Sequence, residues 1–191
     1  MTLDTHVYHK DNAASTYALY REKKTGFLST FPFGVFGYAR LDERLADSPL
    51  WKSAPRAPGR DPMGVTPSQP HVEYANLELY GGPKHLTDFP KDDEHAFAMG
   101  VVLFNQQSRG TVTLKSKNHL DNPVVDHNYL ANPLDMLVFS KACQFANEIV
   151  VEGKGTKDVI SGSWPANLSH HLNTSSEDWE HYVRENATTC T

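Results

Sequence analysis

The alternation of apolar and polar residues predicts three strands in the middle of the chain. Residues 71–80 (HVEYANLELY) alternate, and residues 96–104 (AFAMGVVLF) form a more continuous apolar run that is typical of a buried strand. Residues 111–115 (TVTLK) alternate again after Gly110. The intervening segment NQQSRG predicts a hairpin that pairs the last two strands.

Apolar residues at helical spacing predict three helices around these strands. The first occupies residues 11–25, the second begins at Asn132 and Pro133 and ends at Gly153, and the third begins at residues 175–178. Their apolar positions are Ala13, Tyr17 and Tyr20, then Leu134, Val138, Ala142, Phe145 and Ile149, and finally Trp179, Tyr182 and Val183. Because the strands lie together between helices without regular βαβ alternation, the chain is predicted to be an α+β protein with an antiparallel sheet.

Two segments fall outside this pattern. Six prolines within residues 48–70 predict a long surface loop, of a length that often serves as a lid. Upstream, the segment FLSTFPFGVFGYARL gathers aromatic residues around Gly34 and Gly37, and glycines so close together suit tight turns or the close approach of a ligand. With no internal repeat, residues 1–191 are interpreted as a single domain.

Composition and charge exclude several classes of protein. A content of 39% hydrophobic and 21% charged residues argues against a disordered or fibrous chain, and no apolar run approaches the ~18 residues of a membrane span. Acidic residues exceed basic ones, 23 to 18, and the basic ones are scattered, which argues against a nucleic-acid-binding protein. We therefore expect a small, weakly polar partner and neither a nucleic acid nor a membrane.

No metal site is expected from the sequence. The two cysteines, Cys143 and Cys190, support neither a disulfide framework nor a zinc site built on cysteine. There is no HExxH motif among the ten histidines, and the adjacent His170 and His171 diverge on any regular element.

The N-terminus favours a cytoplasmic protein. It lacks the basic start and apolar core of a signal peptide. Three Asn-x-Ser/Thr acceptors would be glycosylation sites in a secreted chain, and they lie at Asn167, Asn173 and Asn186.

Four sequence motifs of this chain resemble those of one enzyme family. They are KKTGFLSTFPFGVFGYA, QSRGTVTLKS, NPVVDHNYLANPLDMLVFSKACQFANEIV and the tail WEHYVRENATTC. In this order they resemble the carboxy-terminal, substrate-binding domain of the glucose-methanol-choline (GMC) flavin oxidoreductases. The resemblance implies a sheet of about six mostly antiparallel strands flanked by helices.

The parts that this family uses for redox chemistry are not found in the sequence. The family binds its flavin through a βαβ unit with a G-x-G-x-x-G turn, and no such glycine pattern occurs here. The family's catalytic histidine follows a Thr-Cys-Trp-like sequence, whereas this chain has Thr189, Cys190 and Thr191 and then ends. The resemblance therefore implies a truncated homologue, for which we expect no bound cofactor and no oxidoreductase activity by itself.

Two turns within these motifs are interpreted as scaffold. Ser108, Arg109 and Gly110 suit a hairpin turn in which Arg109 pairs with a carboxylate. Asp126, Asn128 and Tyr129 suit a turn in which side chains bond to the neighbouring backbone.

The candidate site residues come from the predicted strands. In residues 71–80, one face carries His71, Glu73, Ala75 and Leu77, and the other Val72, Tyr74, Asn76 and Glu78. Either face mixes polar and apolar groups, as a pocket lining or a solvated sheet face would. The candidate acid–base and hydrogen-bonding groups are His71, Glu73, Tyr74, Asn76 and Asn105. The candidate substrate contacts are Phe31, Phe33, Phe36, Tyr38, Phe97 and Met99.

Three hypotheses about function follow. In the first, the chain binds a hydrophobic metabolite and catalyses a redox-neutral cyclisation, isomerisation or pericyclic-type step in secondary metabolism without a cofactor. In the second, it is a non-catalytic binding or accessory protein. In the third, it is a fragment of an FAD-dependent alcohol oxidase or dehydrogenase. In each case an exposed apolar sheet face should be covered, either by the small molecule or by another subunit such as a second copy.

Overall fold

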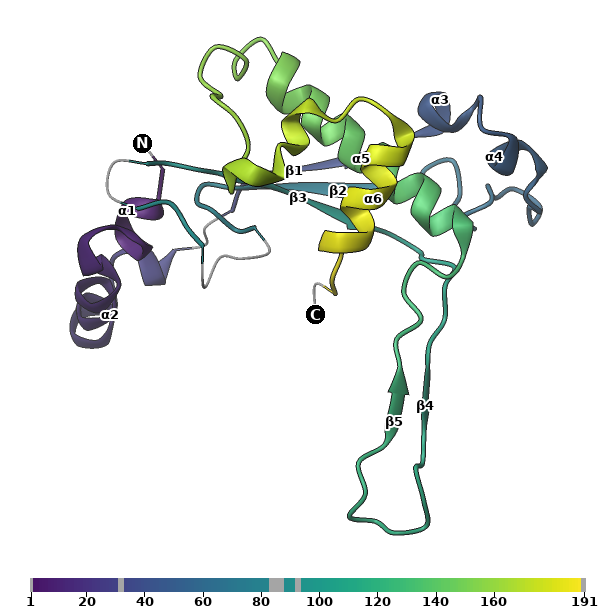
Figure 1. Cartoon of the computed structure of the whole chain (residues 1–191), viewed down its shortest axis with the longest axis horizontal. Coiled ribbons are helices and arrows are strands. Elements are labelled where there is room, and N and C mark those ends of the chain that lie inside the picture. The colour runs from purple at the N-terminus through teal and green to yellow at the C-terminus, as the bar shows by residue number, and fades with distance from the viewer. Residues whose placement is uncertain (1, 31–32, 83–87, 92–93, 190–191) are drawn as a thin grey trace.

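The computed structural model describes residues 2–30, 33–82, 88–91 and 94–189. A three-stranded antiparallel sheet lies at the centre, in the order β1 (Phe33–Ala39), β2 (Val72–Leu77) and β3 (Ala98–Leu103). Helix α5 (Pro133–Glu152) crosses one face of this sheet, and α6 (Ser176–Asn186) packs against α5 (Figure 1). The α+β class and the strands within residues 71–80 and 96–104 are confirmed.

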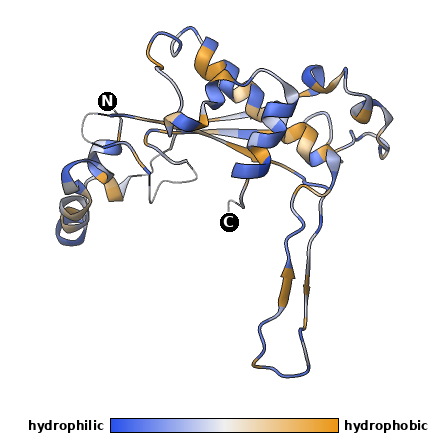
Figure 2. Cartoon of the chain, viewed as in Figure 1, coloured by the Kyte–Doolittle hydropathy of each residue, from blue (hydrophilic) through white to orange (hydrophobic). Residues whose placement is uncertain are grey.

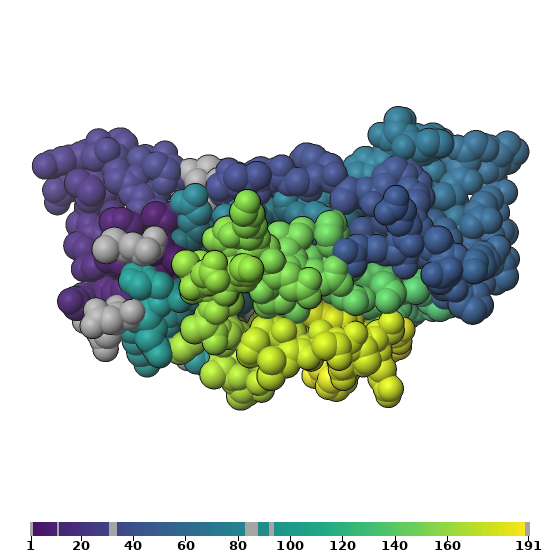
Figure 3. Space-filling view, turned by 90° about the horizontal axis from the view of Figure 1, so that it is seen from above, coloured from purple at the N-terminus to yellow at the C-terminus, as the bar shows by residue number. Residues whose placement is uncertain are grey.

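Helix α5 selects which face of the sheet becomes the core. The Tyr74 hydroxyl donates to the backbone carbonyl of Ala142 on α5 at 3.3 Å, and the Tyr74 ring meets Phe145 edge-on with centroids 5.9 Å apart. Because side chains alternate along a strand, Val72 shares this side and Glu73 points to the opposite side. From the helix side, α5 covers the middle of the molecule (Figure 3).

The core joins the sheet, α5 and the segment that follows β1. Its buried side chains are Leu41, Leu45, Trp51, Met63, Val65, Val72, Tyr74, Leu103, Leu134, Val138, Ala142 and Ala146. Residues 48–70, expected as a surface loop, contain α4 (Pro49–Ser53), which begins where the Ser48 hydroxyl accepts from the Trp51 amide. This segment contributes Trp51, Met63 and Val65 to the core, so it is anchored to the molecule by apolar side chains.

The three predicted helices are confirmed. Asn132 caps α5 and Pro133 opens it, while Ser175 and Asp178 form a capping box at the start of α6. The first helix is α2 (Asn12–Lys23), but none of its residues is buried. The remaining short helices are α1 (Asp4–Val7), α3 (Asp42–Leu45), and the 3₁₀ helices η1 (His9–Asp11), η2 (Phe27–Ser29), η3 (Ala166–Leu168) and η4 (His170–Leu172).

The predicted hairpin between the second and third strands is wrong. Strand β4 (Thr111–Thr113) pairs with β5 (Val124–Asp126), and the two form a separate ribbon that projects from the body (Figure 1). The connection turns away from the sheet because Asp135, in the first turn of α5, accepts hydrogen bonds from the backbone amides of Gln107 and Ser108, both at 2.7 Å. The pairing of Arg109 with a carboxylate is wrong as well, because its guanidinium donates to the carbonyls of Gln106 and Ser108.

The strand count also differs from the expectation. The described residues contain five strands in two sheets instead of about six strands in one. The ribbon strands carry apolar residues far from the core (Figure 2), and Val112 and Leu114 are 70% and 87% exposed. No helix among the described residues has the length and apolarity to cross a membrane.

Candidate functional site

The side of the central sheet opposite α5 carries the candidate site. Residues that pair in register share a face, so Tyr38, Glu73 and Val102 lie together, as do Phe36, Ala75 and Gly100. We call this surface the open sheet face; it comprises Phe36, Tyr38, Glu73, Ala75, Gly100, Val102 and Phe104. It is mostly apolar, and Glu73 is its one carboxylate.

A phenol and a carboxylate meet in the middle of the open sheet face. Tyr38 is 62% exposed, and its ring stacks on Phe104 with centroids 6.3 Å apart. Tyr38 lies opposite Glu73 on the neighbouring strand, and interaction with the Glu73 carboxylate raises the pKa of Tyr38 above its ordinary value. Tyr38 therefore stays protonated at neutral pH, and Glu73 keeps a second oxygen for a ligand.

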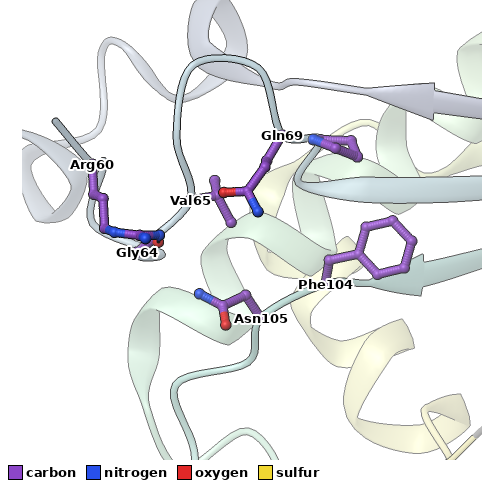
Figure 4. Close-up of a pocket in the computed structure, with 7 residues that line it drawn as sticks. Arg60, Gly64, Val65, Gln69, Phe104 and Asn105 are labelled. Carbon is purple, nitrogen blue, oxygen red and sulfur yellow. The ribbon is translucent and has the colours of Figure 1, made fainter.

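A pocket of about 280 Å³ adjoins this face beyond the end of β3. It is lined by Arg60, Gly64, Val65, Gln69, Pro70, Phe104 and Asn105 (Figure 4). Asn105 adopts a left-handed backbone conformation (φ 56°), and its side-chain amide donates to the carbonyl of Met63. Because Phe104 belongs to both, the pocket and the open sheet face form one continuous surface.

His71 is fully buried instead of facing a ligand. Its Nδ1 accepts from the backbone amide of Leu41 at 2.9 Å, so its Nε2 carries the proton and donates to Asp61 at 2.6 Å. Asp61 in turn accepts from the backbone amides of Met63 and Val65. Both ring nitrogens are used, and His71 positions the segment that forms the pocket wall.

Three carboxylate and imidazole groups, from Asp42, Asp61 and His71, lie within 4.8 Å of one another, close enough to share a metal ion. Arg40 already bridges the two carboxylates, through Nε to Asp42 at 2.7 Å and through Nη2 to Asp61 at 2.8 Å. The hydrogen bond from Arg40 holds the pKa of Asp42 below its usual value. A metal cation would have to displace the guanidinium of Arg40. We therefore interpret this cluster as a set of structural contacts that hold residues 57–70 against β2.

The other predicted residues lie apart from this surface. Tyr74, Asn76 and Met99 lie on the α5 side, where burial raises the pKa of Tyr74 above its ordinary value. Phe97 is half-buried just before β3. Phe31 and the side chain of Phe33 lie outside the described residues.

The structure thus brings together Phe36, Tyr38, Glu73 and Asn105 from the predicted set. It adds Arg60, Gln69 and Phe104, which the sequence interpretation missed. Phe104 could have been found, because it follows Val102 at the two-residue period of the strand. Arg60 and Gln69 lie in the proline-rich segment, which has no periodic signal.

Known proteins resemble the second half of this chain. Residues 106–191 match the family model for the carboxy-terminal part of GMC oxidoreductases. Over these residues, which are slightly less than half of the chain, the protein is similar to the GMC oxidoreductase family. The GMC motifs recognised in residues 106–191 cover α5, α6 and the ribbon, whereas the open sheet face lies upstream of this match.

Two kinds of curated GMC-like protein are similar to the chain. An alcohol dehydrogenase (acceptor) of Pseudomonas putida is 31% identical over 75 residues, which make up 38% of this chain and 14% of that protein. Versicolorin B synthases of Emericella nidulans and Aspergillus parasiticus are 38% and 34% identical over 71 residues, or 37% of this chain and 11% of each synthase. The matched part is thus a small fraction of each relative.

A solved structure extends the likeness to the whole fold. Formate oxidase of Aspergillus oryzae superposes with a TM-score of 0.76 at 21% identity, covering 99% of this chain and 33% of the oxidase chain. The chain therefore has the fold of one third of that oxidase, including the central sheet that the family model does not cover.

The same formate oxidase structure concerns the modification of FAD. The described residues here fit the nucleotide part of that cofactor poorly. A dinucleotide pyrophosphate binds where a glycine-rich turn joins a parallel strand to the start of a helix. Here the sheet is antiparallel, and the link from β1 to α3 is Arg40 and Leu41, with no glycine. No chemical step is therefore assigned through a flavin.

Proposed function

We propose that the open sheet face binds an apolar small molecule and that Glu73, held by Tyr38, is the acid–base group of a redox-neutral cyclisation or isomerisation. The observation that carries the proposal is the cross-strand pair of Tyr38 and Glu73, a phenol and a carboxylate on an otherwise apolar surface. Such a surface, with few convergent polar groups, is typical of a small-molecule site. The two synthases among the similar proteins support a reaction other than oxidation.

The proposed step moves one proton and leaves the oxidation state of the substrate unchanged. A carboxylate oxygen of Glu73 takes the proton of a substrate hydroxyl. At the same time, the hydroxyl oxygen of the substrate attacks an unsaturated carbon of the same substrate molecule. The proton then returns to the atom that receives the electron pair. Tyr38 holds the carboxylate in place, and Phe36 and Phe104 hold the ring system. A positioned base of this kind contributes roughly 10²–10⁴-fold to a rate.

The test compares two glutamate variants on a panel of hydroxylated polyenes, quinone methides and terpenoids. Wild-type protein should convert at least one compound to a product of unchanged mass, detected by chromatography with mass spectrometry. Glu73→Gln should lower kcat about 100-fold or more with little change in KM, because it removes the base and keeps the shape. Glu78→Gln, an exposed carboxylate just past β2, should behave like wild type.

Equal turnover by Glu73→Gln and wild type would disprove the assigned role of Glu73. Binding of compounds without any conversion would favour an accessory protein that carries a metabolite.

A second candidate function is oxidation of an alcohol, which the similarity to the alcohol dehydrogenase of Pseudomonas putida supports. It requires a hydride acceptor such as a flavin. Under our proposal, added FAD should pass through a desalting column separately from the protein. Co-elution of the visible flavin band with the protein, together with alcohol-dependent reduction of a dye, would replace the redox-neutral proposal with this one.

A further inference from the structure

The pocket beside the open sheet face contains an arginine that has no acidic partner. Among the described residues, the Arg60 side chain makes one hydrogen bond, from Nη1 to the carbonyl of Gly64, and no carboxylate lies within ion-pair distance of it. Arg40 and Arg44, by contrast, pair with Asp42 and Glu148. In a chain with a net charge of −5, an arginine at a pocket without an acidic partner is a candidate for ligand binding.

The acidic groups of the neighbouring cavity are bound to a different arginine. A second cavity, of about 310 Å³, shares Arg60 with the first and is also lined by Arg40, Arg56, Asp42 and Asp61. Both carboxylates there are hydrogen-bonded to Arg40. The three guanidinium groups and two carboxylates of this lining give it a net charge of +1, and neither Arg56 nor Arg60 pairs with a carboxylate among the described residues, so the rim between the two cavities favours an anion.

A second donor group faces the same pocket. The Gln69 side-chain oxygen accepts from the amide and the hydroxyl of Thr66, at 2.9 and 3.0 Å. Its Nε2 donors are thereby left for the pocket, since no described residue accepts from them. Figure 4 shows the Gln69 amide between the guanidinium of Arg60 and the ring of Phe104.

The apolar side of the pocket continues onto the open sheet face. Phe104 lies at the end of the pocket away from Arg60 (Figure 4), and it stacks on Tyr38 at an interplanar angle of 16°. A ring lying on Tyr38 and Phe104 can thus extend a polar substituent toward Arg60 and Gln69. The site combines an aromatic platform with an anion-binding end.

From this geometry we infer that the ligand of this site is an aromatic or similarly apolar carboxylic acid, whose carboxylate binds Arg60 and Gln69. The inference rests on the proposed function for the apolar body of the ligand and adds the charged group to it. Guanidinium–carboxylate hydrogen bonds are stronger than neutral ones and can be bidentate, so Arg60 provides both affinity and orientation.

The test is a pair of titrations of the full chain with 2-naphthoate and with its neutral isostere 2-naphthamide, followed by calorimetry. Naphthoate should bind about tenfold more tightly, and the difference should shrink as salt is raised. Arg60→Gln should lower affinity for naphthoate about tenfold and leave naphthamide unchanged. Arg60→Lys should recover part of the affinity for naphthoate, because lysine keeps the positive charge but cannot make the two parallel hydrogen bonds of a guanidinium group.

Matched controls separate binding from folding. Arg184→Gln removes an exposed arginine in the last turn of α6 and should bind both probes like wild type. Each variant is compared with wild type by thermal unfolding. If Arg60→Gln unfolds early, Gln69→Ala provides the independent test and should weaken naphthoate binding several-fold.

The outcomes separate this inference from the proposed function. Equal affinity for the two probes, with no effect of Arg60→Gln, would overturn the inference that Arg60 binds a carboxylate. This result would still be consistent with an apolar binding site. Failure of both probes to bind would overturn the apolar site itself. Glu73→Gln should still bind naphthoate, so a wrong catalytic role for Glu73 would not be mistaken for a wrong anion site.

Discussion

At the scale of single residues, the environment of Cys143 shows how burial controls chemistry. The thiol lies on α5, and desolvation by the surrounding core raises its pKa to about 12. Because the thiolate is the reactive form, Cys143 should be inert in the folded protein.

We expect Ellman's reagent at about pH 8 to leave Cys143 unmodified in the folded state and to modify it completely in denaturant. The measurement uses Cys190→Ser protein, because Cys190 would otherwise contribute its own signal. A rate in the folded state equal to that of a small free thiol would contradict the assigned burial.

At the scale of elements, Asp135 joins α5 to the segment between β3 and β4. This carboxylate is 1% exposed, and it accepts from the Gln107 amide, the Ser108 amide and the Ser108 hydroxyl. Gly110, just beyond, packs so closely on the backbone of Asp126 that a Cβ there would lie 2.2 Å from its carbonyl oxygen. The two contacts together set the direction in which the ribbon leaves the body.

Asp135→Ala should lower the free energy of unfolding by about 2–4 kcal/mol, because three donors lose their acceptor in a buried site. Asp135→Asn should lower the free energy of unfolding by less, since one acceptor oxygen remains. Urea denaturation measures both, with Asp158→Ala as the exposed control. A loss below about 0.5 kcal/mol for Asp135→Ala would show that water replaces the carboxylate.

At the scale of the whole molecule, the chain exposes more surface than its mass requires. Its accessible area is 12,535 Å², whereas a compact monomer of 21.4 kDa exposes about 9,100 Å². The excess exceeds the ~800 Å² per partner that a stable protein interface buries. Exposed apolar side chains in the ribbon account for part of it: Val112, Leu114, Leu120, Val124, Val125 and Tyr129.

We therefore expect the chain to associate with a second copy of itself and to bury part of this surface. Sedimentation equilibrium should give a mass that rises with concentration toward that of a dimer. Combined Leu114→Ser and Leu120→Ser should reduce association, whereas Val159→Ser, at a separate exposed site, should not. A mass of one chain at every concentration would rule out this association.

The local patterns of the sequence predicted the three longest helices and strands β2, β3 and β4. Asn132 and Pro133 mark the start of α5, and Ser175 and Asp178 mark the start of α6, because a capping group satisfies amides within its own turn and needs no distant partner. The two-residue period of residues 71–80 likewise indicated a strand with two different faces. For the candidate site, this period placed Glu73 opposite Tyr74.

The sequence by itself thus determined helices α2, α5 and α6, strands β2 and β3 of the central sheet, and the resemblance to the GMC family, whereas strand β1 was not predicted. Only the tertiary structure decided which strands pair and which face remains open. Strand β4 pairs with β5 and not with β3 because Asp135, on helix α5, binds the connection that follows β3. His71 is buried, and its two ring nitrogens are hydrogen-bonded to Asp61 and to the backbone amide of Leu41. These contacts join residues far apart in the chain, and periodicity, which reports only on neighbours, contains no information about them.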